Sequence, residues 1–151
     1  MAVVLGISER FCTSALLKNR LEKGYMQEVP TDAMQFGIDN EQIARYFYQK
    51  YRKVNVKKAD FVRGVCVNGK CRLVGIADGL IGTDGGIEIK CHMNKDVCHT
   101  IPSYYMTQVV AYMFLYKRQW WDFVSCSFID GKLKKCKIIR VYWKNHRDTW
   151  F

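Results

Sequence analysis

The sequence has no apolar run that approaches the ~20 residues a helix needs to span a membrane. Residues 1–7 are apolar, but this stretch is too short for the hydrophobic part of a signal peptide and has no basic segment before it. Internal repeats, low-complexity segments and interdomain linkers are absent as well. These absences argue against membrane and repeat architectures. They predict a single domain over residues 1–151 in an intracellular protein that is not secreted.

Acidic residues are scarce relative to basic ones. The chain has 14 Asp and Glu against 24 Lys and Arg, which gives a formal net charge of +10. Such an excess of positive charge favours a polyanionic partner, most simply nucleic acid. A basic surface that serves only solubility is the alternative.

The seven cysteines are an odd number. Together with the missing signal peptide, this predicts reduced thiols that are mostly packed in the interior. Cys91-His92 and Cys98-His99 raise the alternative of a zinc site, but their spacing differs from the close ligand pairs typical of zinc.

Apolar periodicity and turn signals predict an α/β fold with a mixed sheet of about five strands flanked by helices. Helices are expected over residues 8–22, 40–51 and 102–117, and strands over 61–67, 71–77, 86–91, 120–128 and 134–143. We expect the first three strands to be antiparallel. Asn68-Gly69 and Asp130-Gly131 have the composition of hairpin turns.

Two further expectations concern the second helix. Thr31-Asp32 is expected to cap a short separate turn, and Asp39 to cap the helix itself. Ile43, Phe47 and Tyr51 recur at helical spacing and are expected to face the core.

The segment from Asp78 to Lys90 has the residues for phosphodiester chemistry. Asp78 ends one apolar run, and Glu88-Ile89-Lys90 lies in the next strand after a glycine-rich turn. Strand alternation places Glu88 and Lys90 on one face and Ile87 and Ile89 on the other. This arrangement predicts a divalent metal held by Asp78, Glu88 and the backbone carbonyl of Ile89. Lys90 would orient or deprotonate the attacking water. A simple ion pair between Glu88 and Lys90 is the alternative.

Three blocks occur in a fixed order along the chain. They are Phe36-Gly37-Ile38-Asp39-Asn40-Glu41-Gln42-Ile43-Ala44-Arg45, then Ala77-Asp78-Gly79-Leu80 with Glu88-Ile89-Lys90-Cys91, then Tyr104-Tyr105-Met106-Thr107-Gln108-Val109. Together they resemble the λ-exonuclease-like (YqaJ-type) viral recombinase and alkaline exonuclease family of the PD-(D/E)XK nuclease superfamily.

The resemblance implies a restriction-endonuclease-like core with Mg²⁺ or Mn²⁺ as cofactor. The catalytic residues that it implies are Glu41, Asp78, Glu88, Lys90 and Gln108. The DNA-binding residues that we expect, from the resemblance and from the basic C-terminal hairpin, are Arg10, Ser14, Lys95, Tyr105, Lys134 and Lys135.

For function, the resemblance implies a metal-dependent deoxyribonuclease. The expected activity is 5′-to-3′ exonuclease action on duplex DNA ends in viral or phage recombination or DNA processing. A ring-shaped trimer, a single-strand annealing partner and a location in the host cytoplasm or nucleus are implied as well. The alternatives are a structure-specific endonuclease, such as a junction resolvase, and a catalytically silent nucleic-acid-binding module. Glu41, Asp78, Glu88 and Lys90 are all present, which disfavours the silent module.

Overall fold

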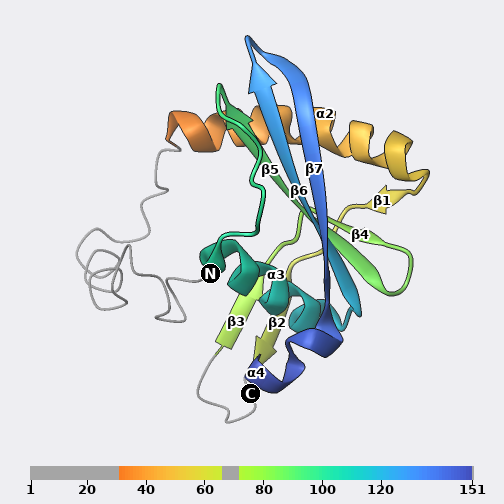
Figure 1. Ribbon diagram of the computed structural model, residues 1–151. Coiled ribbons are helices and arrows are strands. Elements are labelled where there is room, and N and C mark those ends of the chain that lie inside the picture. The colour runs from red at the N-terminus through yellow and green to blue at the C-terminus, as the bar shows by residue number, and fades with distance from the viewer. Residues whose placement is uncertain (1–30, 66–71, 151) are drawn as a thin grey trace.

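The computed structural model describes residues 31–65 and 72–150, in which a mixed five-stranded sheet packs between two long helices (Figure 1). The helices are α2 (Asp32–Arg52) and α3 (Ser103–Tyr116). The sheet strands are β1 (Val56–Lys57), β4 (Gly79–Ile81), β5 (Gly85–Met93), β6 (Trp120–Ile129) and β7 (Lys132–Tyr142), in the order β1-β4-β5-β6-β7. A separate hairpin consists of β2 (Val62–Val65) and β3 (Arg72–Gly75), and η1 (Trp143–Asn145) and α4 (Arg147–Trp150) follow the sheet. The predicted α/β fold with a sheet of about five strands is confirmed.

The pairing of the central strands differs from the prediction. β5 runs parallel to β6, from Gly85 opposite Trp120 to Met93 opposite Phe128, and antiparallel to β4. The expectation that β5 would join β2 and β3 in one antiparallel arrangement is therefore wrong. Parallel neighbours need a long crossover connection, and α3 supplies it between β5 and β6.

α2 is one helix of 21 residues rather than a short turn followed by a shorter helix. It begins after Thr31, whose hydroxyl oxygen accepts a hydrogen bond from the amide nitrogen of Met34 at 3.3 Å. Asp39 lies inside the helix and accepts a hydrogen bond from Gln35, so its predicted capping role is wrong. Gly37 lies in the interior of α2, although a glycine at such a position costs about 1 kcal/mol of stability relative to alanine. The helix tolerates this cost.

The buried face of α2 also differs from the prediction. Ile43, Phe47 and Tyr51 are exposed, whereas Ala44 and Tyr48 are buried. Both sets have helical spacing, so periodicity alone does not choose between them. Tyr48 faces the sheet because its hydroxyl reaches a buried carboxylate, that of Asp122 on β6, at 2.6 Å.

Each face of the sheet has its own core. One core lies under α3 and includes Val109, Met113, Trp121 and Phe123. The other lies under α2 and includes Ala44, Tyr48, Ile87, Ile89, Val124, Cys126 and Phe128. The turn between β6 and β7 is at Asp130-Gly131, as predicted, with φ angles of 48° and 72°. Positive φ at both residues is typical of a type I′ turn. No helix in the described parts of the chain is both long and apolar enough to cross a bilayer.

Close packing at Gly86 leads to the first prediction. A Cβ atom at this position would lie 2.2 Å from the buried indole ring of Trp121, whereas a Cβ at Gly37 would meet nothing within 4 Å. We expect Gly86→Ala to lower the free energy of unfolding by about 1–3 kcal/mol, because overpacking forces the ring to shift. Gly37→Ala is the control and is expected to be neutral or stabilising by up to about 1 kcal/mol. Urea denaturation of the two variants measures the difference, and a wild-type midpoint for Gly86→Ala would contradict this packing.

Candidate active site

The predicted site lies at the N-terminal end of β4, beyond which β5 continues without this neighbour. The β4–β5 pairing ends with Gly79 opposite Ile87, whereas β5 extends to Met93. Asp78 immediately precedes β4, and its Oδ2 accepts a hydrogen bond from the amide nitrogen of Ile89 at 2.6 Å. The N–H and C=O groups of one strand residue point to the same side. The carbonyl of Ile89 therefore also faces the edge at which Asp78 lies.

Glu88 and Lys90 lie on the α3 side of β5, while Ile87 and Ile89 pack in the core under α2. Glu88 is only 1% exposed, and its Oε1 accepts a hydrogen bond from Nζ of Lys90 at 2.5 Å. Its Oε2 is buried and has no hydrogen-bond partner among the described residues. A buried carboxylate oxygen without a partner is energetically costly, and a bound cation would satisfy it.

α2 brings a third carboxylate to the site. Arg45 forms an ion pair with Glu41, one helical turn away, and Nη2 of Arg45 donates a second hydrogen bond to the backbone oxygen of Asp78 at 2.7 Å. Arg45 thus connects α2 to the residue that precedes β4. Sequence reasoning gave Arg45 no role, although its position four residues after Glu41 was a signal for such a pair.

α3 supplies the opposite wall. Nζ of Lys90 lies 4.9 Å from the centroid of the Tyr105 ring. Nε2 of Gln108 donates to the Tyr112 hydroxyl at 3.3 Å, and this hydroxyl donates to the backbone oxygen of Ile76 at 2.8 Å. Burial, and then the charge of nearby Glu88, raise the pKa of Tyr112 to about 12. The helical spacing of four residues puts Tyr112 on the same face as Gln108, but sequence reasoning gave Tyr112 no role at the site.

The carboxylates at the site are costly to ionise together. Burial, followed by the charge of Glu88, raises the pKa of Asp78 to about 8. Burial also raises the pKa of Glu88, although the charge of Lys90 opposes this effect. For Lys90, burial alone would lower the pKa, but the charges of Glu88 and Asp78 outweigh it and the pKa is raised. A divalent cation between the carboxylates would relieve their mutual repulsion.

The donors at the site match a hard cation better than zinc. Within residues 31–65 and 72–150, no three His, Cys, Asp or Glu side chains converge as a metal-ligand group. The carboxylates of Asp78 and Glu88 do lie close to the Ile89 carbonyl. Water molecules would supply the remaining ligands of a metal ion there. Mg²⁺ commonly uses one or two carboxylates and keeps several waters, and carbonyl and carboxylate oxygens also suit Mn²⁺. The four described cysteines are free thiols. Cys126 is buried, whereas Cys91, Cys98 and Cys136 are half-buried, so packing in the interior describes only Cys126 fully.

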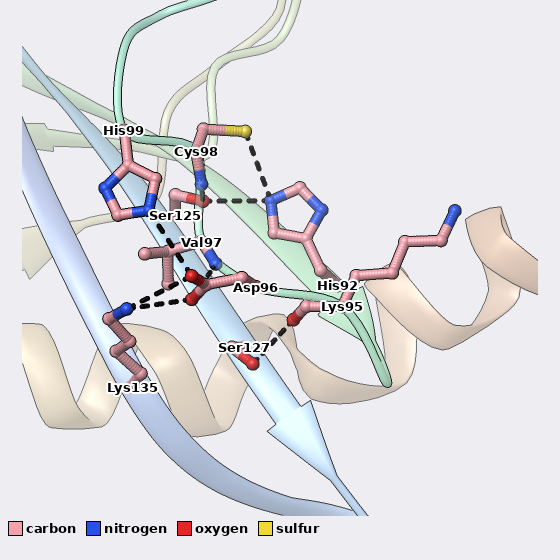
Figure 2. A network of polar contacts seen from close by, with 9 residues as sticks. All are labelled: His92, Lys95, Asp96, Val97, Cys98, His99, Ser125, Ser127 and Lys135. Carbon is pink, nitrogen blue, oxygen red and sulfur yellow. Dashed lines mark hydrogen bonds and ion pairs between the residues drawn. The ribbon is translucent and has the colours of Figure 1, made fainter.

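The predicted DNA-binding residues that the structure describes do not gather at one place as the predicted catalytic residues do. Lys95 lies in the loop after β5; its backbone oxygen accepts a hydrogen bond from Ser127 at 2.6 Å, and Figure 2 shows its side chain extending away from the polar network. Lys134 is exposed on β7, whereas Nζ of Lys135 is ion-paired with Asp96 at 2.9 Å. Arg10, Ser14, the helix expected over 8–22 and the Asn68-Gly69 turn lie outside the described residues.

Comparison of the chain with known proteins identifies its family. The model of the YqaJ-like viral recombinase domain matches residues 1–117. The chain belongs to the YqaJ-like viral recombinase family. No curated protein matches the chain.

Solved structures have the same fold as this YqaJ-family chain. The alkaline exonuclease LHK-Exo from Laribacter hongkongensis is 26% identical, with a TM-score of 0.64 over 90% of this chain and 70% of that one. The structure of LHK-Exo in complex with dAMP gives a TM-score of 0.66 at 25% identity, with the same 90% and 70% coverage. A phage-related exonuclease from Haemophilus somnus 129PT is 12% identical, with a TM-score of 0.64 over 91% of this chain and 74% of that one, which shows likeness of fold alone.

Proposed function

We propose that this YqaJ-family protein is an exonuclease that uses Mg²⁺ or Mn²⁺ to hydrolyse phosphodiester bonds from the ends of duplex DNA in the 5′-to-3′ direction. The observation that carries this proposal is the meeting of Asp78, Glu88 and the Ile89 backbone edge just before β4 begins, with Lys90 beside them. The unpartnered Glu88 Oε2 supports a cation at this point. Family membership supports the activity, as does the likeness to an alkaline exonuclease whose structure has been solved with dAMP.

Asp78 and Glu88 would hold the metal through their carboxylates, and Ile89 through its carbonyl. When bound, Mg²⁺ or Mn²⁺ neutralises negative charge on the phosphate and lowers the pKa of water. Asp78 is held for this role by the hydrogen bond from the Ile89 amide, and Glu88 by the hydrogen bond from Lys90. Both carboxylates therefore keep fixed orientations before substrate binds, which reduces the reorganisation needed during reaction.

The remaining residues would position water and substrate. The ammonium group of Lys90, between Glu88 and the ring of Tyr105, would hold the attacking water by donating a hydrogen bond. The Gln108 amide donates to Tyr112, so its carbonyl oxygen is oriented to accept from a water. Glu41, fixed by Arg45, would orient a further water at the edge of the site.

The wider assembly follows from family membership and stays part of the proposal. DNA would be the substrate, and the basic charge of the chain fits a phosphate backbone. A ring-shaped homotrimer and a single-strand annealing partner would place the nuclease in recombination. Its site of action would be the cytoplasm or nucleus of an infected host.

Substrate form and metal removal test this function together. With Mg²⁺, we expect linear duplex DNA to release mononucleotides, while closed circular duplex and an end-blocked four-way junction remain intact. Label at the 5′ end should be released before label at the 3′ end, because attack starts at the 5′ terminus. Excess EDTA should stop the reaction. Gel electrophoresis of each substrate over time is the measurement.

Each alternative has its own outcome in this assay. Circular DNA cut as fast as linear DNA would replace the exonuclease with an endonuclease. Early loss of 3′ label would reverse the polarity. Cleavage that continues unchanged in EDTA would contradict the proposed dependence on Mg²⁺ or Mn²⁺.

A further inference from the structure

A groove of about 340 Å³ lies along one side of α2 and shares Glu41 and Arg45 with the proposed active site. Its walls are formed by Ile38, Glu41, Gln42, Arg45, Tyr46 and Gln49. Glu41 and Arg45 belong to the charged cluster around Asp78, so the groove is continuous with that cluster. Its volume lies at the lower end of the range of about 300–1,000 Å³ that is typical of small-molecule sites.

The middle of the groove has the chemistry to hold a nucleobase. Tyr46 is 60% exposed, although it is a large aromatic residue on a helix that packs on the sheet. The Nζ atom of Lys50 lies 5.3 Å from the centroid of the Tyr46 ring. An exposed aromatic ring with a cation beside it is the combination with which proteins bind single strands, since the ring stacks on a base and the cation contacts a phosphate. The amides of Gln42 and Gln49 add groups able to hydrogen-bond a base edge.

The far end of the groove leads to a basic surface. Oε1 of Gln49 accepts a hydrogen bond from the backbone nitrogen of Val56, which places this end next to β1. The exposed lysines in this region are Lys50, Lys53, Lys57 and Lys58. No carboxylate of the described residues forms an ion pair with any of these four. Positive charge without acidic partners here is suited to a phosphate backbone that leaves the active site along α2.

We propose that this groove binds one strand of the DNA beside the scissile phosphate, with a base stacked on Tyr46 and a phosphate at Lys50. This inference rests on the proposed nuclease function and adds a substrate subsite to it. Glu41 lies on the side of the groove next to the proposed active site, and its carboxylate would repel a bare phosphate there. The base therefore occupies the centre, and the flanking phosphate lies towards the lysines.

Binding of a fluorescently labelled single-stranded oligonucleotide in EDTA, followed by anisotropy, tests the subsite without hydrolysis. Tyr46→Ala is expected to raise Kd about 5- to 150-fold, the loss typical of one base–aromatic stack. Tyr46→Phe keeps the ring and should bind like the wild type. Lys50→Ala is expected to reduce the slope of log Kd against log salt concentration by about 0.7. This is the change expected for the loss of one phosphate contact on a single strand.

Tyr51→Ala is the matched control, because Tyr51 is also an exposed tyrosine of α2 (66%) but lines a different cavity with Phe47, Cys136 and Ile138. It should leave Kd unchanged. Thermal unfolding of each variant checks that the helix is intact, as expected for substitutions of exposed side chains.

The outcomes separate the subsite from the function. Wild-type Kd for both Tyr46→Ala and Lys50→Ala, in a protein that degrades linear DNA with Mg²⁺, would overturn the subsite and leave the nuclease proposal standing. Equal weakening by Tyr46→Ala and Tyr51→Ala would also overturn it, because a general effect on α2 would then explain both. A wild-type protein that binds the oligonucleotide with the predicted variant pattern but degrades no DNA would support the groove and refute the nuclease.

Discussion

Glu88→Gln is expected to fold like the wild-type protein and to lose nearly all nuclease activity. The amide oxygen of glutamine can still accept the hydrogen bond from Lys90, so the local packing around this buried position is preserved. The amide cannot replace the anionic oxygen that the proposed metal needs. We expect the rate of mononucleotide release to fall at least about 100-fold, the scale on which losing one electrostatic stabiliser slows a reaction. The Mn²⁺ affinity measured by calorimetry should fall as well.

Two further variants make this result specific. Asp84→Asn changes an exposed acid in the turn of the same hairpin and should leave both rate and Mn²⁺ affinity at wild-type values. Lys90→Ala should abolish cleavage but keep Mn²⁺ binding, because the lysine contacts Glu88 without being a proposed ligand. Wild-type activity in Glu88→Gln, or equal loss in Asp84→Asn, would refute the site.

Asp122→Ala is expected to cause the largest loss of stability. The side chain of Asp122 on β6 is fully buried and accepts hydrogen bonds from the Tyr48 hydroxyl at 2.6 Å and from Arg140 at 2.7 and 2.9 Å. Arg52 lies at 3.5 Å from the same carboxylate. Removing one member of such a buried group leaves the others without partners and typically costs about 3–5 kcal/mol. Because domains are stable by only about 5–15 kcal/mol, the variant should be close to unfolding.

Urea denaturation gives this difference, and two comparisons test its cause. Tyr48→Phe removes one hydroxyl and should cost about 1–3 kcal/mol, the penalty for an unpaired buried partner. Asp148→Ala removes an acid whose side chain is 85% exposed and should leave the midpoint unchanged. An Asp122→Ala midpoint equal to that of the wild type would show that the ionic group contributes nothing net to folding.

Local chemistry allowed the centre of the site to be predicted. The alternation of Glu88 and Lys90 with Ile87 and Ile89 is a property of any strand, and the structure has it. The return of Asp78 to this strand required only a short turn, and its carboxylate does reach the Ile89 amide. These features depend on neighbours in sequence, so the sequence was sufficient.

Contacts between distant segments were harder to predict. The parallel pairing of β5 and β6 depends on a crossover through α3, and the strand–helix–strand order was the available signal. On α2, the stripe of Ile43 and Phe47 looked as suitable for the core as Ala44 and Tyr48. The choice was decided by Asp122, more than 70 residues away, which no periodicity in α2 could reveal.

The short length of β4 has a consequence for how this site could change. β4 has three residues against nine in β5, and the proposed catalytic residues Glu88 and Lys90 lie in the stretch of β5 that does not pair with β4. Access of substrate to the proposed site would therefore depend on a difference in strand length rather than on any single side chain. A related protein could block this access by extending β4 towards residue 77, while Asp78, Glu88 and Lys90 are all retained. A relative could thus lose the proposed activity while keeping the motif. The length of the strand that corresponds to β4 should therefore be compared together with the motif residues.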